Sequence, residues 1–217
     1  MKLTSDNKIW IPDADGWSSW SLKYEQGQFN KIKKEFKGNI AIDVGAHVGI
    51  WTLRLSKYFG QVICFEPLLK HIECHNENCK SLNNVILNEV ALSNTKRFSV
   101  MKTMDNNSGR SSLDKKFRIE TEDIMVKTDI LDNYEFDKID FIKIDVEGHE
   151  LKMLEGGIKT IKKYNPDIFI ETWTTNKKST FEFLEDIGYS LFLNLSSTNY
   201  YFKHKKGEHG FKRSNRP

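Results

Sequence analysis

The sequence contains few cysteines, and their spacing fits neither a disulfide framework nor a metal site. Cys64, Cys74 and Cys79 are the only three in 217 residues, without a C-x-x-C pair and without metal-ligand spacing to histidine. An odd number of thiols in this arrangement favours free cysteines in a reducing compartment. We therefore do not expect a small secreted domain held together by disulfides.

Long apolar runs and a strong charge of one sign are also missing. The apolar stretches are only strand-sized, so we expect no membrane span, and the first ten residues, MKLTSDNKIW, lack the apolar core of a signal peptide. The 33 Lys and Arg residues nearly balance the 30 Asp and Glu residues. A net charge of +3 gives no reason to expect a nucleic acid partner. We expect a cytoplasmic globular protein.

From residue 39 onward the sequence alternates between strand-like and helix-like segments, which predicts a doubly wound α/β domain with a mostly parallel sheet. We divide the chain into an N-terminal arm (1–38), the α/β domain (39–204) and a basic tail (205–217). Strands are expected at 40–44, 62–65, 85–92, 141–145 and 167–171, with a closing antiparallel hairpin from 189–195 and 200–203. Helices are expected at 24–36, 48–59, 68–81, 151–161 and 179–187.

The segment DVGAHVG, residues 43–49, ends the first predicted strand and begins the next helix. Gly45 allows a tight turn that brings the backbone close to a ligand, and Gly49 lets the helix start pack against the sheet. The segment lacks the G-x-G-x-x-G pattern of dinucleotide folds. Asp43 would repel a pyrophosphate but would attract the ammonium of an amino-acid moiety. This favours S-adenosylmethionine (SAM) over NAD, the alternative being that Asp43 only caps the turn.

A second carboxylate ends the second predicted strand, where Glu66 precedes Pro67. Its distance from Asp43 matches that of the acidic residue that accepts hydrogen bonds from both ribose hydroxyls of a nucleotide cofactor. A carboxylate suits that role because its two oxygens can accept two donors side by side. Ala46 and His47 complete the candidate cofactor turn. His47 either contacts the carboxylate of the methionine moiety or only shapes the turn.

These motifs, taken together with the segment KIDVEGHE at residues 143–150, resemble the FkbM-type methyltransferase family. The stretches ALS (91–93) and NSG (107–109) also stand where that family has similar sequence, and the resemblance covers residues 40–171. It implies the class I methyltransferase fold with a seven-stranded sheet, SAM as methyl donor, and usually transfer to oxygen. It also implies a set of cofactor contacts: Asp43, Gly45 and Glu66, with Ala91 or Leu92 against the adenine.

Acidic residues gather after the last two parallel strands: Asp145, Glu147, His149 and Glu150 after one, Glu171 at the end of the other. In one arrangement His149 or Asp145 is the general base, with Glu147 beside it. In another, Asp145 and Glu171, with Glu147, hold Mg²⁺. Simpler roles stay open: Glu147 capping the next helix, Glu150 facing solvent, Glu171 binding a backbone amide and His149 hydrogen-bonding in a loop. Asp145 belongs to the site in both arrangements, and it is also a candidate cofactor contact.

The segments outside these motifs carry weaker signals. Trp10, Trp17 and Trp20 could stack on a sugar ring, but such aromatic residues more often pack an arm onto the domain. The polar region 104–122, with Asn107, is either a loop that closes over the acceptor or an exposed linker.

The function predicted from the sequence is a SAM-dependent O-methyltransferase. The expected acceptor is a hydroxyl of a sugar, glycan or related natural product, a choice that rests on the family resemblance. Two alternatives remain, an NAD-dependent oxidoreductase on a Rossmann sheet and a non-catalytic cofactor-binding module. RNA methylation is less favoured, because the sequence has neither an Asn/Asp-Pro-Pro-Tyr motif nor a basic stripe.

Overall fold

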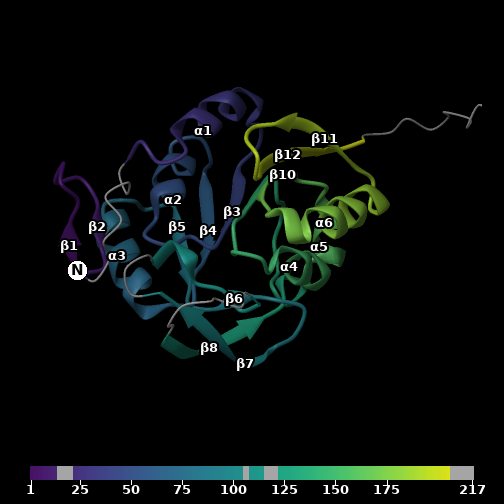
Figure 1. Ribbon diagram of the computed structural model, residues 1–217. Coiled ribbons are helices and arrows are strands. Elements are labelled where there is room, and N and C mark those ends of the chain that lie inside the picture. Colours follow the sequence, from purple (N-terminus) through teal and green to yellow (C-terminus); the bar gives the residue numbers. More distant parts are fainter. Residues whose placement is uncertain (14–21, 105–107, 115–121, 206–217) are drawn as a thin grey trace, which may run out of the picture.

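The alternation of strands and helices produces a seven-stranded sheet covered on both faces (Figure 1). The computed structural model describes residues 1–13, 22–104, 108–114 and 122–205. In spatial order the strands of this sheet are β11 (Tyr189–Asn194), β12 (Asn199–His204), β10 (Asp167–Glu171), β9 (Phe141–Ile144), β3 (Ile40–Val44), β4 (Gln61–Phe65) and β5 (Val85–Asn88). Only β12 runs antiparallel to its neighbours. The predicted parallel sheet with a closing hairpin is confirmed.

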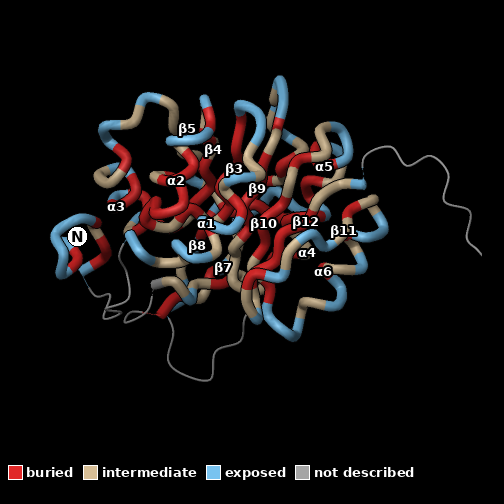
Figure 2. Tube along the Cα trace, turned by 90° about the horizontal axis from the view of Figure 1, so that it is seen from above, coloured by how far each residue is buried: buried red, intermediate tan, exposed pale blue. Residues whose placement is uncertain are grey.

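Helices cover the two faces of the sheet as separate groups. One group consists of α1 (Gln26–Ile32), α2 (Ile50–Leu55) and α3 (Leu69–Cys79), and the other of α4 (Glu150–Gly156), α5 (Ile158–Tyr164) and α6 (Thr174–Asp186). In the first group, Trp51 and Leu55 of α2 pack against Ala41 of β3. In the second, Met153 of α4 and Leu184 of α6 belong to the other main cluster of the core. Figure 2 shows buried positions concentrated along the central strands.

The central strands are apolar because both of their faces are covered. Every residue of β3 and β9 is buried. Two charged residues nevertheless stand inside these runs, Asp43 on β3 and Lys143 on β9, and the parallel register pairs them directly. Buried charges of opposite sign on adjacent strands predict a structural or functional role at this edge of the sheet.

Two predicted elements are interrupted in the structure. The strand expected at 85–92 divides at Val90, whose N–H donates to the Asn88 carbonyl, and Ala91 and Leu92 then pair with a different sheet. The helix expected at 151–161 divides at Gly157. The carboxylate of Asp132 accepts hydrogen bonds from backbone N–H groups at the start of α5, so a new helix begins there.

Two small sheets complete the described chain. A three-stranded sheet contains β6 (Ala91–Leu92), β8 (Glu122–Asp129) and β7 (Arg97–Thr103), and lies at the lower edge in Figure 1. In the N-terminal arm, β1 (Lys2–Leu3) pairs with β2 (Trp10–Ile11). Short 3-10 helices occur at Lys33–Glu35, Ser108–Arg110 and Leu131–Asn133.

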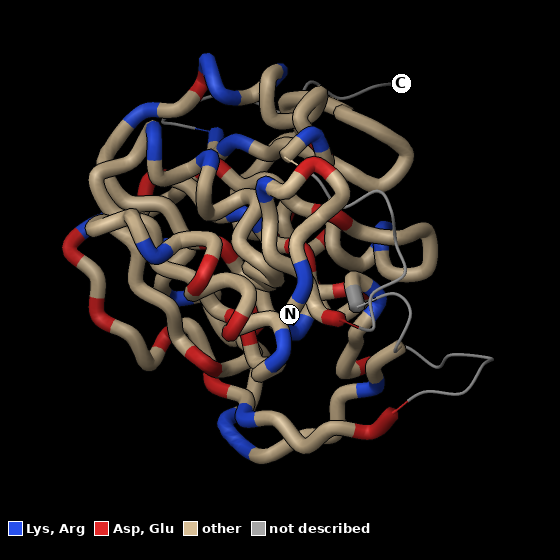
Figure 3. Tube along the Cα trace, turned by 90° about the vertical axis from the view of Figure 1, so that its left-hand side faces the viewer, with Lys and Arg blue, Asp and Glu red and all other residues tan. Residues whose placement is uncertain are grey.

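The distribution of charged residues on the surface and the character of the helices agree with the balanced charge and the short apolar runs of the sequence. On the side of the molecule shown in Figure 3, Lys and Arg positions are interspersed with Asp and Glu positions. Within the described ranges, no helix combines the length and the apolar character needed to cross a membrane.

Candidate active site

A cavity of about 420 Å³ lies beyond the carboxyl ends of the central parallel strands. It opens where the chain order reverses between β3 and β9, the position at which open α/β sheets bind ligands. Its wall includes most of the predicted site residues: Gly45, Ala46, His47, Glu66, Pro67, Ala91, Leu92, Asp145, Glu147, His149 and Glu171. The structure therefore brings together residues that are up to 126 positions apart in the sequence.

The turn after β3 requires a glycine at position 45. Gly45 has a φ of +73°, and a Cβ there would lie 1.9 Å from the carbonyl oxygen of Asp145. The N–H groups of Gly45 and Ala46 both donate to the Phe65 carbonyl, at 3.0 and 3.1 Å. The close contact between this turn and the end of β9 thus depends on the missing side chain.

Gly49 has a different role from the predicted one. It precedes α2 with a φ of +89°, and a Cβ there would approach Cys79 Sγ and His75 Cδ2, both at 3.0 Å. Both of these residues belong to α3, so Gly49 allows α3 rather than the sheet to come close. Gly49 is not part of the cavity wall.

Asp43 lies behind the cavity wall instead of facing the cavity. Its carboxylate is fully buried, accepts a hydrogen bond from Thr52 Oγ1 at 2.8 Å, and lies 3.3 Å from Lys143 Nζ. Lys143 does line the cavity, and its Nζ donates to the Gly45 carbonyl at 2.7 Å. Burial alone would lower the pKa of Lys143, but the Asp43, Asp145 and Glu25 carboxylates raise it above its ordinary value. Asp43 thus holds a permanently charged lysine against the cofactor turn.

Glu66 follows β4 in the cavity wall and holds the turn through hydrogen bonds. Its Oε2 accepts the His47 N–H at 2.9 Å, and its Oε1 accepts the Leu68 N–H at 3.0 Å and the His71 ring Nδ1 at 3.0 Å. Burial would raise the pKa of Glu66, but His71 and the backbone donors lower it. Glu66 is therefore an ionised carboxylate fixed in the cavity wall.

The other half of the cavity is acidic and aromatic. Asp145 and Glu171 line it together with Trp51 and Trp173. Burial, and after it the neighbouring carboxylates Asp145, Glu25 and Glu147, together raise the pKa of Glu171 to about 9. Burial likewise raises the pKa of Asp145, against the opposing effect of Lys143. Carboxyl groups in this environment can hold or accept a proton near neutral pH.

The N-terminal arm contributes to this half of the site, a feature that the sequence did not indicate. Tyr24 lines the cavity, and the Glu25 carboxylate accepts a hydrogen bond from Trp51 Nε1 at 2.7 Å. Burial and the Asp145 charge raise the pKa of Glu25. Among the predicted arm residues, Trp10 packs away from the cavity, where its N–H donates to Asn78 of α3. Trp17, Trp20 and Asn107 lie outside the described residues.

The predicted magnesium site receives no support. Within the described ranges, no group of three or more His, Cys, Asp or Glu side chains is arranged to hold a metal ion. Asp145 and Glu171 both line the cavity. Glu147, the third metal ligand of the hypothesis, does not form a metal-binding group with them.

The comparison with protein-family models gives one match. The methyltransferase FkbM domain matches residues 43–191, which is more than half of the chain. The chain belongs to the FkbM methyltransferase family. Among curated proteins, none matched this sequence.

Solved structures agree on the fold. Methyltransferase FkbM from Methylobacillus flagellatus KT superposes with a TM-score of 0.56 at 18% identity, covering 76% of this chain and 43% of that protein. An rRNA methylase from Streptococcus thermophilus gives a TM-score of 0.52 at 11% identity, covering 82% and 93%. The SMU.1697c protein of Streptococcus mutans, in complex with S-adenosylhomocysteine (SAH), gives 0.51 at 13% identity, covering 81% and 93%. This chain thus spans less than half of the Methylobacillus protein, and the likeness establishes the class I methyltransferase fold.

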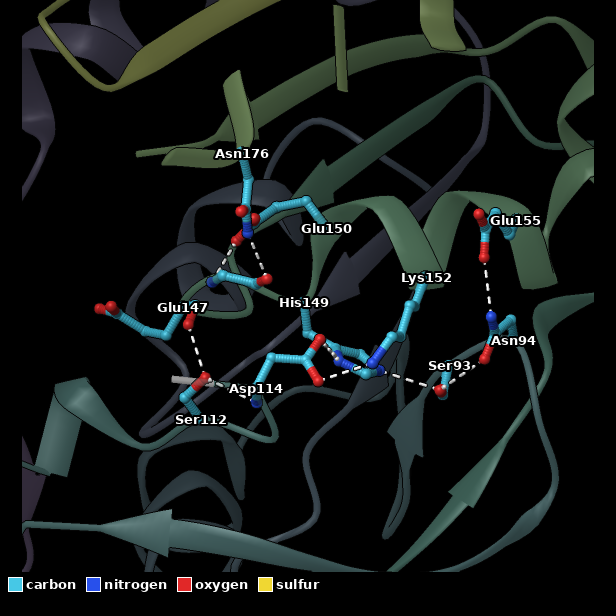
Figure 4. Close-up of polar contacts among 11 residues, drawn as sticks. Ser93, Asn94, Ser112, Asp114, Glu147, His149, Glu150, Lys152, Glu155 and Asn176 are labelled. Carbon is cyan, nitrogen blue, oxygen red and sulfur yellow. Dashed lines mark hydrogen bonds and ion pairs between the residues drawn. The ribbon is translucent and has the colours of Figure 1, made fainter. Parts of the chain in front are cut away.

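In this member of the FkbM family, His149 is fixed from both sides (Figure 4). Its Nδ1 lies 2.6 Å from Asp114 Oδ2, and its Nε2 lies 2.9 Å from Ser93 Oγ. Lys152 holds the other oxygen of Asp114 at 2.7 Å. Since the carboxylate can only accept, Nδ1 carries the ring proton and Nε2 accepts from the serine. Burial lowers the pKa of His149 despite the Asp114 charge, so the ring is neutral.

This arrangement joins three segments of the chain: the end of β6, the segment before residue 115, and the start of α4. Ser112 strengthens the junction, because its Oγ donates to the Glu147 carbonyl at 2.6 Å. With both ring nitrogens engaged, the geometry favours a positioning role for His149 over that of a general base. Glu147 itself has a φ of +51° and lies before α4, whose N-cap residue is His149.

The prediction that Glu150 faces solvent is wrong. Its side chain is fully buried, and Oε1 accepts the Gly148 N–H at 2.7 Å (Figure 4). Burial raises the pKa of Glu150 to about 7. The carboxylate is turned back onto the loop between β9 and α4, because the Gly148 N–H at the start of this helix is available as a donor.

The raised pKa of Glu171 predicts a specific dependence of stability on pH. The unfolded carboxyl titrates near 4.5, so between that pH and about 9 the folded protein binds more protons than the unfolded chain. The free energy of unfolding should therefore fall as pH rises through this window, by up to about 1.4 kcal/mol per pH unit. Glu171→Gln removes this contribution, so the variant should gain stability relative to the wild type between pH 6 and pH 8.

Urea denaturation at several pH values measures this difference. Glu182→Gln, on the exposed surface of α6, is the matched control and should show no pH-dependent change relative to the wild type. If the free energy of unfolding changed with pH in the same way for Glu171→Gln and for the wild type across this range, Glu171 would titrate at its ordinary pKa.

Proposed function

We propose that this chain is a SAM-dependent methyltransferase that transfers the methyl group to a hydroxyl oxygen of a sugar or a related polyhydroxylated natural product. The observation that carries the proposal is one continuous cavity with two chemically different ends. Glu66 follows β4 at one end, Glu171 ends β10 at the other, and the Gly45 turn and Asp145 lie side by side between them. The first end suits a nucleoside, and the second suits a polar acceptor with an apolar face.

The residues at the first end fit SAM. Glu66 offers an ionised, buried acceptor for a ribose hydroxyl, and Ala91 and Leu92 offer an apolar wall for a base. The Gly45 turn allows backbone to approach the ligand closely. The carboxyl groups of Asp145 and Glu171 favour a cationic sulfonium and ammonium over a pyrophosphate, because a nearby cation lowers their raised pKa values whereas an anion raises them further, and this supports SAM over NAD. The SAH bound in the Streptococcus mutans structure, which shares this fold, supports the same choice.

SAM, when bound, supplies a methyl group on a sulfonium that is itself the leaving group, so the chain must orient the acceptor and manage its proton. Asp145 and Glu171 face the cavity, and a cationic ligand beside them would lower their raised pKa values, so that either carboxylate could then receive a hydroxyl proton. The rings of Trp51 and Trp173 can pack against the apolar face of a sugar. Lys143 is bound to the Gly45 carbonyl and to Asp43, so it fixes the turn and does not act as the base.

Transfer of radiolabelled methyl groups tests the reaction type. Purified protein is incubated with labelled SAM and separate panels of glycosides, amines and RNA. The account predicts label in a glycoside hydroxyl, and a loss of turnover of about 100-fold in Glu171→Gln with SAH affinity unchanged. Glu182→Gln should retain full turnover. Label in RNA or in amines alone would exclude the proposed sugar or natural-product acceptor and leave the family assignment intact.

A further inference from the structure

The carboxylate of Glu66 has fewer free hydrogen-bond acceptor positions for a ligand than its position in the sequence predicts. Its Oε1 already accepts the Leu68 N–H and His71 Nδ1, and its Oε2 accepts the His47 N–H. An ionised carboxylate offers about two acceptor positions on each oxygen. One position on Oε2 therefore remains, whereas a ribose presents two adjacent hydroxyl donors.

His71, which bonds to the other oxygen of Glu66, has an unused ring nitrogen. The residue lines the cavity and is only 2% exposed. Because Nδ1 bonds to a carboxylate, Nδ1 carries the proton, and in the neutral ring Nε2 is an acceptor. Nε2 is buried and has no hydrogen-bond partner among the described residues. Leaving such an atom unsatisfied costs about 1–3 kcal/mol, so a ligand that donates to it gains that contribution.

The orientation of the His71 ring is fixed, which makes the unused nitrogen a preorganised acceptor. The Glu66 contact holds one edge of the ring, and the His47 ring packs against it with centroids 4.1 Å apart. His71 belongs to α3 and His47 to the cofactor turn, so the two elements that enclose the nucleoside end both support this ring.

We propose that His71 is a cofactor-binding residue that shares the ribose with Glu66. Glu66 Oε2 accepts the hydrogen bond of one ribose hydroxyl, and His71 Nε2 accepts that of the other. The inference rests on the proposed function, since it takes the nucleoside of SAM as the ligand. It predicts selection for an unmodified ribose, because a 2′-phosphate or a missing hydroxyl would leave one of these acceptors without its donor.

The test combines a change in the protein with a change in the ligand. In His71→Asn the side-chain amide can still donate to Glu66, while the atom corresponding to Nε2 is gone. SAH and its 2′-deoxy and 3′-deoxy analogues are titrated calorimetrically into the wild type and the variant. His204→Asn, at the end of β12 and outside the cavity wall, is the matched control.

The wild type should bind SAH about tenfold more tightly than His71→Asn does, and it should lose about tenfold in affinity for each deoxy analogue. In His71→Asn, one of the two analogues should bind as well as SAH itself. His204→Asn should behave as the wild type. The inference is overturned if His71→Asn binds SAH with wild-type affinity, or if both analogues still bind tenfold more weakly than SAH.

A measurement on the wild type covers the case in which the variant does not fold. Histidine side-chain ¹⁵N spectra should show a shift of the His71 Nε2 signal on addition of SAH. One of the two deoxy analogues, the one that lacks the hydroxyl bonded to Nε2, should cause no such shift. An Nε2 signal unchanged by bound SAH overturns the inference. A wild type that does not bind SAH at all contradicts the proposed function instead, so the two failures are distinct.

Discussion

Replacing Lys143 with methionine is expected to lower the free energy of unfolding by about 3–5 kcal/mol, because the change leaves the buried carboxylate of Asp43 and the partly buried carboxylate of Asp145 without their counter-charge. Lys143 Nζ lies 3.3 Å from Asp43 and 3.7 Å from Asp145, and its side chain is 3% exposed. The same change removes the donor to the Gly45 carbonyl, so the affinity for SAH should fall as well. Denaturant unfolding and calorimetry measure the two effects.

Lys152→Met is the matched control for this prediction. Lys152 contacts Asp114 at 2.7 Å, but its side chain is 44% exposed, so the cost should stay below about 1 kcal/mol. The double variant Asp43→Asn/Lys143→Met should recover part of the stability that Lys143→Met loses, since it removes one unpaired charge. An unfolding midpoint for Lys143→Met equal to that of the wild type would show that this buried charge network does not stabilise the fold.

Replacing Gly45 with alanine should have an effect of similar size through sterics alone. The added methyl group would lie 1.9 Å from the Asp145 carbonyl oxygen, and the positive φ of 73° is unfavourable for a residue with a side chain. The carbonyl belongs to the backbone at the end of β9 and cannot move without displacing Asp145. We expect a loss of about 2–4 kcal/mol in stability and a strong loss of SAH affinity.

Gly27→Ala serves as the control for Gly45→Ala. Gly27 lies in α1, and no atom lies within 4 Å of the position that its Cβ would occupy. A helix-interior glycine replaced by alanine should leave stability unchanged or raise it by up to about 1 kcal/mol. The steric explanation fails if the two variants unfold at the same denaturant concentration.

The parts of the fold and site that follow from local sequence were predictable. The strand at 40–44 has the bounds expected from its apolar run, and Gly45 stands in the turn expected after it. Glu66 lies at the end of β4 in the cavity wall, as its spacing from Asp43 indicated. These features depend on patterns of fewer than 25 residues, within which periodicity and turn chemistry decide the structure.

The contacts that depend on distant segments were not predictable in the same way. His149 is fixed by Asp114 and Ser93, which are 35 and 56 residues away. Glu25 contacts Trp51 of the cavity wall, 26 residues further along the chain, and lies close enough to Asp145 for that carboxylate to raise the pKa of Glu25. No local pattern records such pairings, because tertiary packing alone determines them.

Lys143 and His71 were missed although each carried a signal. A lysine inside the apolar run FIKI indicates a buried charge, and a buried charge requires a partner. His71 follows Glu66 by five residues across a turn, a separation that becomes a contact only once α3 folds back over the strand end. The division of the strand at Val90 also carried a signal, because the polar residues Asn88 and Glu89 interrupt the apolar run just before the break.

The central claim is that the cavity binds SAM, and calorimetric titration of the purified protein with SAH tests it most directly. NADH is the ligand control, and Glu66→Gln, which keeps the shape of the side chain but loses its charge, is the variant. The account predicts one SAH site with a Kd of about 1–100 µM, weakened at least about tenfold in Glu66→Gln, and no heat from NADH. An absence of SAH binding, or binding of NADH in its place, would contradict the account.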